Sequence, residues 1–323
     1  MRLYRLLRIF YTDWFYSRYH SKFLLKVYKL IFLWPLEQIL VRFRIHSSKE
    51  HPTMQIDDNI VNKDIVVSLT TMPSRIKNVH HTIESILRQT MLPDRIVLNL
   101  CKEELDNAGV SLTKELQAYE RNNMLKIHWV KENLKPHKKY FEVIQDYRDK
   151  HIITIDDDIW YDEKTIEKLW NIHINHPNCV CAHIIRVIQI NNNQFLPYLG
   201  WLHQYPKKDS ESMYFLGIGE GGVLYPPHIF DNSNLFDLST LKETALRADD
   251  LWLKAHELCN GIAVASGNYI CCNLTIPTSQ KVSLTSINNN KHISGNDAQW
   301  ALLNNKFQLI NYFISDLQQN NEQ

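Results

Sequence analysis

The run His151-Ile152-Ile153-Thr154-Ile155-Asp156-Asp157-Asp158 decides the fold class of this chain. Its first five residues are mostly apolar and β-branched, which is typical of a strand buried on both faces of a sheet. Three consecutive carboxylates follow at the point where such a strand leaves the core. Because ligands bind beyond the carboxyl ends of strands in open α/β sheets, the run predicts a binding site at the end of a central strand.

The same alternation of strands and helices continues on both sides of this run. Short β-branched runs predict strands at 65–69, 95–100 and 126–130, and apolar spacing predicts helices near 79–87 and 138–147. This order predicts an α/β domain over residues 58–318, with a mainly parallel sheet flanked by helices. The loop 70–75 follows the first strand, so we expect it at the same sheet edge as the three aspartates.

The acidic triplet has the composition of a divalent metal site. Adjacent carboxylates repel one another, so a fold tolerates them best beside a cation. On an extended segment Asp156 and Asp158 project to one side and Asp157 to the other. Their oxygens suit Mg²⁺ or Mn²⁺, and Mg²⁺ takes much of its shell from substrate phosphates. The alternative is a helix N-terminus, where Asp is favoured, but the next helix is expected only near Asp162.

The first 50 residues differ in charge from the rest of the chain. The whole sequence of 323 residues is 44% hydrophobic and 22% charged, with a net charge of +1. These values indicate a folded globular protein without general affinity for nucleic acid. Residues 1–50 hold ten Lys or Arg and three acids, a local charge of +7 (10 − 3).

The cysteines indicate the compartment. Six cysteines without paired CxxC spacing indicate reduced thiols and a cytoplasmic protein.

This basic segment mixes aromatic and aliphatic residues with its cations. The stretch 23–40 is interrupted by Lys26, Lys29, Pro35 and Glu37, and is therefore too polar to span a bilayer. Rings at headgroup level and cations on anionic lipid would suit an interfacial segment. Extra helices packed on the domain are the alternative. We expect a basic amphipathic arm and linker over 1–57, which contacts a membrane through residues 1–50, and a protein peripheral on the inner face of that membrane.

Two motifs resemble one enzyme family. The segment 153–161 is similar to the DxD segment of GT-A-fold glycosyltransferases, and 67–76 resembles the first strand and nucleotide-binding loop of bacterial enzymes of this type, including those that build capsules and surface polysaccharides. The resemblance covers roughly residues 62–315 and implies a Rossmann-like GT-A fold with a nucleotide-sugar donor. It assigns Asp158 as the principal metal ligand and Asp156 to the metal-bound water or the ribose. The donor-binding residues that it implies are Thr70, Thr71, Arg75, Asp156 and Asp157.

A second acidic site, Asp249-Asp250, resembles the motif that begins the acceptor-side helix of these enzymes. In inverting members a carboxylate there removes the proton from the acceptor hydroxyl, and we expect Asp250, with Asp249 next, in that role. Helix capping by Asp249 is the alternative. Upstream, the basic turn 135–140 would place Lys138 or Lys139 beside the diphosphate, or else is a solvated turn.

Two remaining motifs complete the expected site. The glycine-rich run 217–222 lacks the ending of a P-loop and resembles the sugar-pocket loop, with Gly221 and Gly222 at the donor. An ordinary bulged hairpin is the alternative. His292 is a candidate third metal ligand or diphosphate contact, although a lone His is more often neither.

These motifs together imply a metal-dependent, inverting hexosyl- or N-acetylhexosaminyltransferase. It would use Mn²⁺ or Mg²⁺, a nucleotide-sugar donor, and a glycan or lipid-linked acceptor. The alternatives are a retaining transferase of the same fold, a Mg-dependent phosphatase or nucleotidyltransferase, and a non-catalytic carbohydrate-binding protein. An aspartate-dependent phosphatase expects a small residue and Thr or Val soon after its nucleophile, which Ile159-Trp160-Tyr161 does not supply.

Overall fold

A computed structural model describes residues 2–11, 22–49, 58–204, 208–267, 269, 272–277 and 295–313. Its centre is an eight-stranded sheet in the order β11-β14-β6-β13-β4-β1-β2-β3. The bounds of these strands are β1 Val61–Thr70, β2 Leu92–Cys101, β3 Lys126–Val130, β4 His151–Thr154, β6 Val180–Ala182, β11 Ser210–Ser212, β13 Val223–Tyr225 and β14 Val264–Ser266. The neighbouring strands β4, β1, β2 and β3 are parallel, and β6 is parallel to β14. Strand β13 is antiparallel to its neighbours β4 and β6, and β11 is antiparallel to β14. The sheet is therefore mainly parallel, as the sequence predicts.

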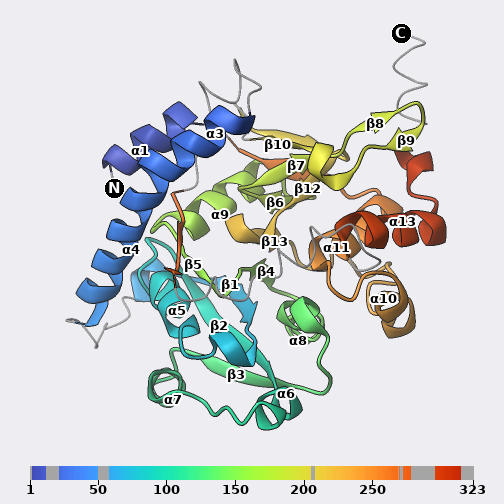
Figure 1. Cartoon of the computed structure of the whole chain (residues 1–323). Helices are drawn as coiled ribbons and strands as arrows, with labels where there is room; N and C mark the ends of the chain where they lie inside the picture. Colours follow the sequence, from blue (N-terminus) through green and yellow to red (C-terminus); the bar gives the residue numbers. More distant parts are fainter. Residues whose placement is uncertain are drawn as a thin grey trace.

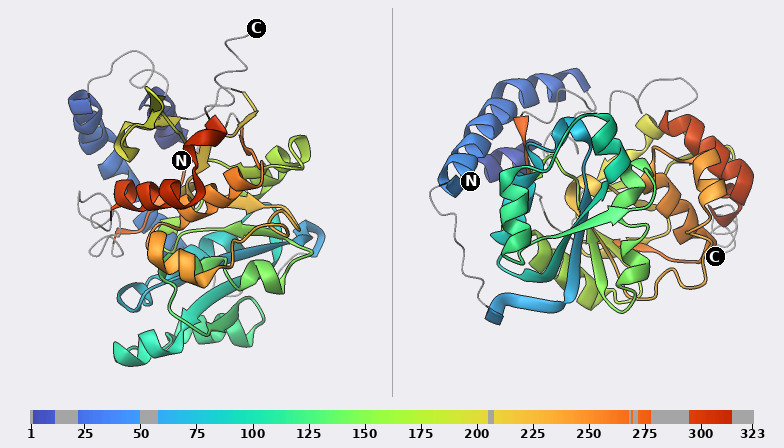
Figure 2. Two further views of the ribbon diagram at one scale, coloured as in Figure 1. Left: turned by 90° about the vertical axis from the view of Figure 1, so that its right-hand side faces the viewer. Right: turned by 90° about the horizontal axis from the view of Figure 1, so that it is seen from below.

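Helices cover both faces of this sheet, which runs through the middle of the molecule in Figure 2. After the N-terminal arm the α-helices are α5 Val79–Leu87, α6 Lys102–Asn107, α7 Lys114–Arg121, α8 Val143–Asp146, α9 Thr165–Asn175, α10 Leu238–Thr244, α11 Asp249–Cys259 and α13 Asn296–Phe307. The short 3₁₀ turns are η3 Asp58–Ile60, η4 Pro73–Arg75, η5 Lys135–Lys139, η6 Tyr198–Gly200 and η7 Gly219–Gly221. Small sheets add the strand pairs β5 Ile159–Trp160 with β15 Leu274–Thr275 and β8 Ile190–Asn191 with β9 Gln194–Phe195, and the trio β7 Ile185–Val187, β10 Leu202–Gln204 and β12 Phe215–Gly217.

Strand β1 shows why the sheet is central. Its alternate residues Ile65, Val67 and Leu69 enter the core shared with α5 and α9, whereas Val66 enters a cluster with Val143 of α8. All four are fully buried. A strand with both faces covered needs a continuous apolar run, and this is the pattern from which the sequence predicts it.

The sequence prediction for the segment before the triplet strand is wrong in one respect. We expected a helix over 138–147, but the chain forms the 3₁₀ turn η5 and then the four-residue helix α8. Lys138 and Lys139 lie in the turn, where Pro136 fixes an early φ angle and Lys135 adopts a positive φ of 56°. Their side chains are consequently directed into the molecule.

The N-terminal arm packs on the domain as helices. Its elements are α1 Arg2–Ile9 and one continuous helix made of α3 Lys22–Tyr28, the π-helical turn η2 Lys29–Leu33, and α4 Trp34–Lys49. Figure 1 shows them together along one side of the molecule. Tyr4, Leu33 and Val41 are buried with Trp160 and Leu274, so the arm covers the strand pair β5–β15. None of the described helices combines the length and apolar character needed to cross a bilayer.

Candidate active site

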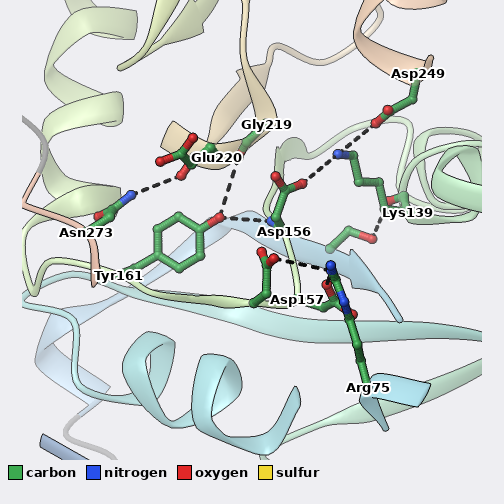
Figure 3. Close-up of polar contacts among 11 residues, drawn as sticks. Arg75, Lys139, Asp156, Asp157, Tyr161, Gly219, Glu220, Asp249 and Asn273 are labelled. Carbon is green, nitrogen blue, oxygen red and sulfur yellow. Dashed lines mark hydrogen bonds and ion pairs between the residues drawn. The ribbon is translucent and has the colours of Figure 1, made fainter. Parts of the chain in front are cut away.

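The acidic triplet is tied to the loop after β1. Strands β1 and β4 are parallel neighbours, so both of their carboxyl ends lie at one sheet edge. The Thr71 hydroxyl donates to the Asp157 carboxylate at 2.5 Å, and Arg75 Nη1 donates to its other oxygen at 2.7 Å. Thr82 of α5 donates to the Asp157 backbone carbonyl at 2.9 Å. Asp157 therefore anchors the two segments to each other, and Figure 3 shows it directed toward Arg75.

Asp158 lies close to the negative charges of Asp156 and Asp157. Burial, together with the charges of Asp156 and Asp157, raises the pKa of Asp158 to about 7, although Arg75 Nη1 lies 3.3 Å from its carboxylate and opposes the rise. The backbone N–H of Asp156 donates to the Tyr161 hydroxyl at 2.8 Å, which fixes the turn at the triplet. Such crowded carboxylates gain from a nearby divalent cation.

Lys139 joins the two acidic motifs. The Ser68 hydroxyl donates to its backbone carbonyl at 2.5 Å, which fixes η5 against β1. Its Nζ lies 3.0 Å from Asp156 Oδ1 and 2.7 Å from Asp249 Oδ2 (Figure 3). Burial would lower the pKa of Lys139, but these carboxylates outweigh it and hold the pKa well above its usual range. A charged lysine therefore lies between the motifs.

Lys138 is also buried, at 3% exposure, so the interpretation of this segment as a solvated basic turn is wrong. Its ammonium pairs with Glu104 of α6, and its Nζ lies 3.5 Å from the Thr71 carbonyl. Lys138 thus supports the loop after β1, whereas Lys139 lies between the acidic groups.

Asp249 and Asp250 occupy the first turn of α11. The capping position belongs to Ala248, with no side-chain cap bond, so capping by Asp249 is not observed. Burial would raise the pKa of Asp249, but Lys139 outweighs it and the pKa lies below its ordinary value. At Asp250, burial and the neighbouring charge of Asp249 raise the pKa well above its ordinary value. Of the two, Asp250 has the greater affinity for a proton.

The glycine run approaches this centre at one position. A Cβ on Gly219 would lie 2.9 Å from both Asp156 Oδ1 and Lys139 Nζ, so a larger residue there would have to displace one end of that ion pair. Gly221 instead packs against Ile184, and Gly222 uses a φ of 82° beside Leu169. Both glycines thus contact apolar side chains, and their expected place at the donor stays a prediction.

A cavity of about 620 Å³ joins these groups. Ten of the site residues predicted from the sequence line it: Thr70, Thr71, Arg75, Lys138, Lys139, Asp156, Asp157, Asp158, Asp249 and Asp250. The predicted Gly221 and Gly222 do not. His292 lies outside the described residues. Sequence reasoning missed Lys29, Glu104, Arg186 and Tyr198, which also line it. They come from four separate elements and belong to no motif, so only their folded positions identify them.

The donor set in the cavity fits a hard divalent cation. Asp156 and Asp158 offer carboxylate oxygens, and the remaining coordination positions would fall to substrate phosphates and water. The residues that the structure describes also hold a separate group, His176, Cys179 and Glu211, whose ligand atoms lie within 4.8 Å of one another. That group is not among the residues lining the cavity.

One family model and several solved structures are similar to parts of this chain. The model of "Glycosyl transferase family 2" matches residues 71–222, which contain the loop after β1, η5 and the triplet. No curated protein matches the chain. Similar solved structures are S. aureus TarS 1–349 in complex with UDP (14% identity, 64% of this chain and 58% of that one, TM-score 0.44) and S. aureus TarS (17%, 63% and 35%, 0.42). A third is 4-diphosphocytidyl-2C-methyl-D-erythritol synthase (12%, 45% and 72%, 0.29). The matched region thus spans under two thirds of either TarS chain.

Proposed function

We propose that this chain is a nucleotide-sugar glycosyltransferase of the GT-A fold that moves a hexosyl or N-acetylhexosaminyl group onto a hydroxyl of a glycan or lipid-linked acceptor, with inversion. The match of the glycosyl transferase family 2 model to residues 71–222 supports the proposal. One observation carries the proposal: the triplet and the second acidic motif, far apart in sequence, face one cavity and share Lys139. Inverting transfer needs a diphosphate site and a base close together, and the two motifs on this cavity would supply them.

The donor half of the site would be the triplet edge. Asp158 and Asp156 would hold Mn²⁺ or Mg²⁺, which when bound neutralises charge on the leaving diphosphate. Thr70 and Thr71 line the cavity beside them, and Arg75 stays paired with Asp157 and Asp158. Arg75 thereby keeps the Asp158 carboxylate in place. Lys139 would direct positive charge at the same phosphates from the other side.

The acceptor half would be the start of α11. The acceptor oxygen forms a bond to the anomeric carbon as the bond from that carbon to the diphosphate oxygen breaks. The acceptor's proton passes to the Asp250 carboxylate. A carboxylate whose pKa is raised by burial and by Asp249 is a stronger base than a solvated one, and this favours Asp250 over Asp249.

The test is release of nucleoside diphosphate from a panel of nucleotide-sugars with Mn²⁺. We expect Asp158→Asn and Asp250→Asn each to lower turnover by about a hundredfold or more. Only Asp158→Asn should also raise the Mn²⁺ concentration needed for half-maximal rate. Asp149→Asn is the control, because the Asp149 side chain is 87% exposed and pairs with His228 on the surface. Wild type that turns over no donor, or an Asp158→Asn variant with full activity, would contradict the proposal.

A further inference from the structure

The outer side of the N-terminal arm is unusually apolar for a surface. Among the described residues, nineteen large hydrophobic side chains are exposed, and ten of them lie in the arm. We call these ten the outer apolar face: Leu3, Leu6, Phe10, Leu24, Leu30, Ile31, Phe32, Trp34, Ile39 and Phe43. A concentration of this kind on one part of a protein marks an interaction surface.

Helix periodicity shows that this exposure is built into the arm. Leu3 and Leu6 of α1, and Phe10 just after its end, recur at the spacing of one helix face and are exposed, whereas Tyr4 is fully buried. The Tyr28 hydroxyl donates to the Leu7 carbonyl at 3.3 Å, which holds α1 against the second helix. On α4, Ile39 and Phe43 lie one turn apart, 65% and 68% exposed, with Val41 buried behind them. Each helix therefore presents apolar residues on two sides, one of which the domain covers.

Exposed cations lie among these apolar residues. Arg5 is exposed on α1, and Lys26 and Arg42 are exposed on the second helix. Apolar side chains that enter the headgroup boundary, beside cations that meet anionic lipid, are the two components of interfacial binding. A second copy of the chain would be a poorer partner, because a symmetric contact brings each cation toward like charge on its copy.

The arm is also part of the catalytic cavity. Lys29, at the start of η2, lines the cavity, and the next residues, Leu30 and Ile31, belong to the outer apolar face. Buried Glu37 of α4 accepts the Thr275 backbone N–H at 2.7 Å, and the neighbouring Ile276 N–H donates to the Asp158 backbone carbonyl at 2.8 Å. The apolar face therefore begins at the rim of the site.

We propose that the outer apolar face docks on an anionic bilayer, so that the catalytic cavity opens at the membrane surface and receives an acceptor held there by a lipid anchor. Lys29 at the rim suits the phosphate that such an anchor carries next to its sugar. The acceptor part rests on the proposed glycosyl transfer, whereas the docking part does not.

Vesicle flotation tests the docking. We expect the full chain to float with phosphatidylcholine vesicles that contain phosphatidylglycerol, and to float less with phosphatidylcholine alone. The triple variant Leu3→Ser, Leu6→Ser, Phe10→Ser should lose about a hundredfold in vesicle partitioning, given the apolar area it removes. Its donor hydrolysis in solution should match wild type, because these side chains are exposed and do not line the cavity. Ile174→Ser and Leu199→Ser remove exposed apolar residues outside the arm and should float like wild type.

Several outcomes would overturn the docking. These are wild type that stays in solution with both vesicles, a triple variant that floats normally, and equal flotation on the two lipid compositions. A wild-type dimer in sedimentation that the triple variant converts to monomer, without flotation, would assign the face to a second copy instead. Failure of the glycosyl-transfer proposal is recognised separately, as flotation without turnover of any donor.

Discussion

At the residue scale, the positive charge of Lys139 offsets the negative charge of the two acidic motifs. The two motifs hold five aspartates, and Arg75 forms ion pairs with only Asp157 and Asp158 of the triplet. The buried ammonium contacts Asp156 and Asp249 at 3.0 and 2.7 Å. Breaking a buried pair is costly because it leaves an uncompensated charge. The position therefore needs both a lysine and the space that Gly219 leaves for it.

This requirement gives a prediction at Gly219. In Gly219→Ala the new Cβ must displace Lys139 or Asp156, so we expect turnover to fall about tenfold or more and the free energy of unfolding to fall by about 1–3 kcal/mol. Steady-state kinetics and urea unfolding measure the two effects. Gly200→Ala is the matched control, because its Cβ would meet Leu196 Cβ at an ordinary 3.6 Å. Equal behaviour of the two variants would show that the close approach at Gly219 is unimportant.

At the scale of elements, the strand pair β5–β15 connects the arm to the triplet. Strand β5 follows Asp158 directly, and β15 pairs with it in antiparallel register. Asn273, just before β15, accepts the Asp162 N–H and donates to the Glu220 carbonyl, each at 3.0 Å. On the other side, Glu37 bonds to Thr275. The Glu37 side chain of the arm thus holds β15, and β15 pairs with the segment after the triplet, which makes α4 a support of the site.

We therefore expect Glu37→Ala to affect catalysis although Glu37 touches no substrate. The Thr275 N–H would lose its acceptor, which costs about 1–3 kcal/mol of unfolding free energy where the group is shielded from water. The Mn²⁺ concentration for half-maximal donor turnover should rise about tenfold, as for other groups that orient ligands indirectly. Gln38→Ala, on the same helix, should leave both values unchanged. A Glu37→Ala variant with a normal metal requirement would argue against this connection.

At the scale of the whole molecule, the fold keeps several histidines neutral in its interior. Burial lowers the pKa of both His137 and His183 to about 4, and both side chains are fully buried. His183 Nε2 lies 2.9 Å from the Thr165 carbonyl, and His137 Nε2 lies 2.9 Å from the Ala245 carbonyl. The unfolded chain takes up these protons near pH 6.5, whereas the folded one does so only near 4.

Stability should therefore fall on acidification. The contribution of each histidine is complete above about pH 6.5 and is lost as the pH falls from there toward about 4, at up to about 1.4 kcal/mol per pH unit. Urea unfolding of wild type and His183→Gln at a series of pH values measures this loss, and the variant should lose less on acidification. His228→Gln, at a position where the side chain is 48% exposed, should run parallel to wild type. A His183→Gln curve parallel to wild type would refute the assignment.

Much of this arrangement was predictable because local patterns carry it. The continuous apolar run before Asp156 requires a strand covered on both faces, and chirality and connection rules then place its end beside the loop after β1. The buried turn η5 was not predictable in this way, since Lys138 and Lys139 look like solvent-facing charges until their partners Glu104, Asp156 and Asp249 are known. Pairing between distant residues leaves no periodic signal.

The sequence by itself determined the α/β order of elements, the acidic triplet at a strand end, the second acidic motif and the basic apolar arm, because each depends on neighbours within a few residues. The folded arrangement was needed to see that Lys139 joins Asp156 to Asp249, that Gly219 approaches this pair, and that Glu37 and Lys29 of the arm reach the site. These contacts join segments that fold together from far apart, and their distances are fixed by the packing of the whole core.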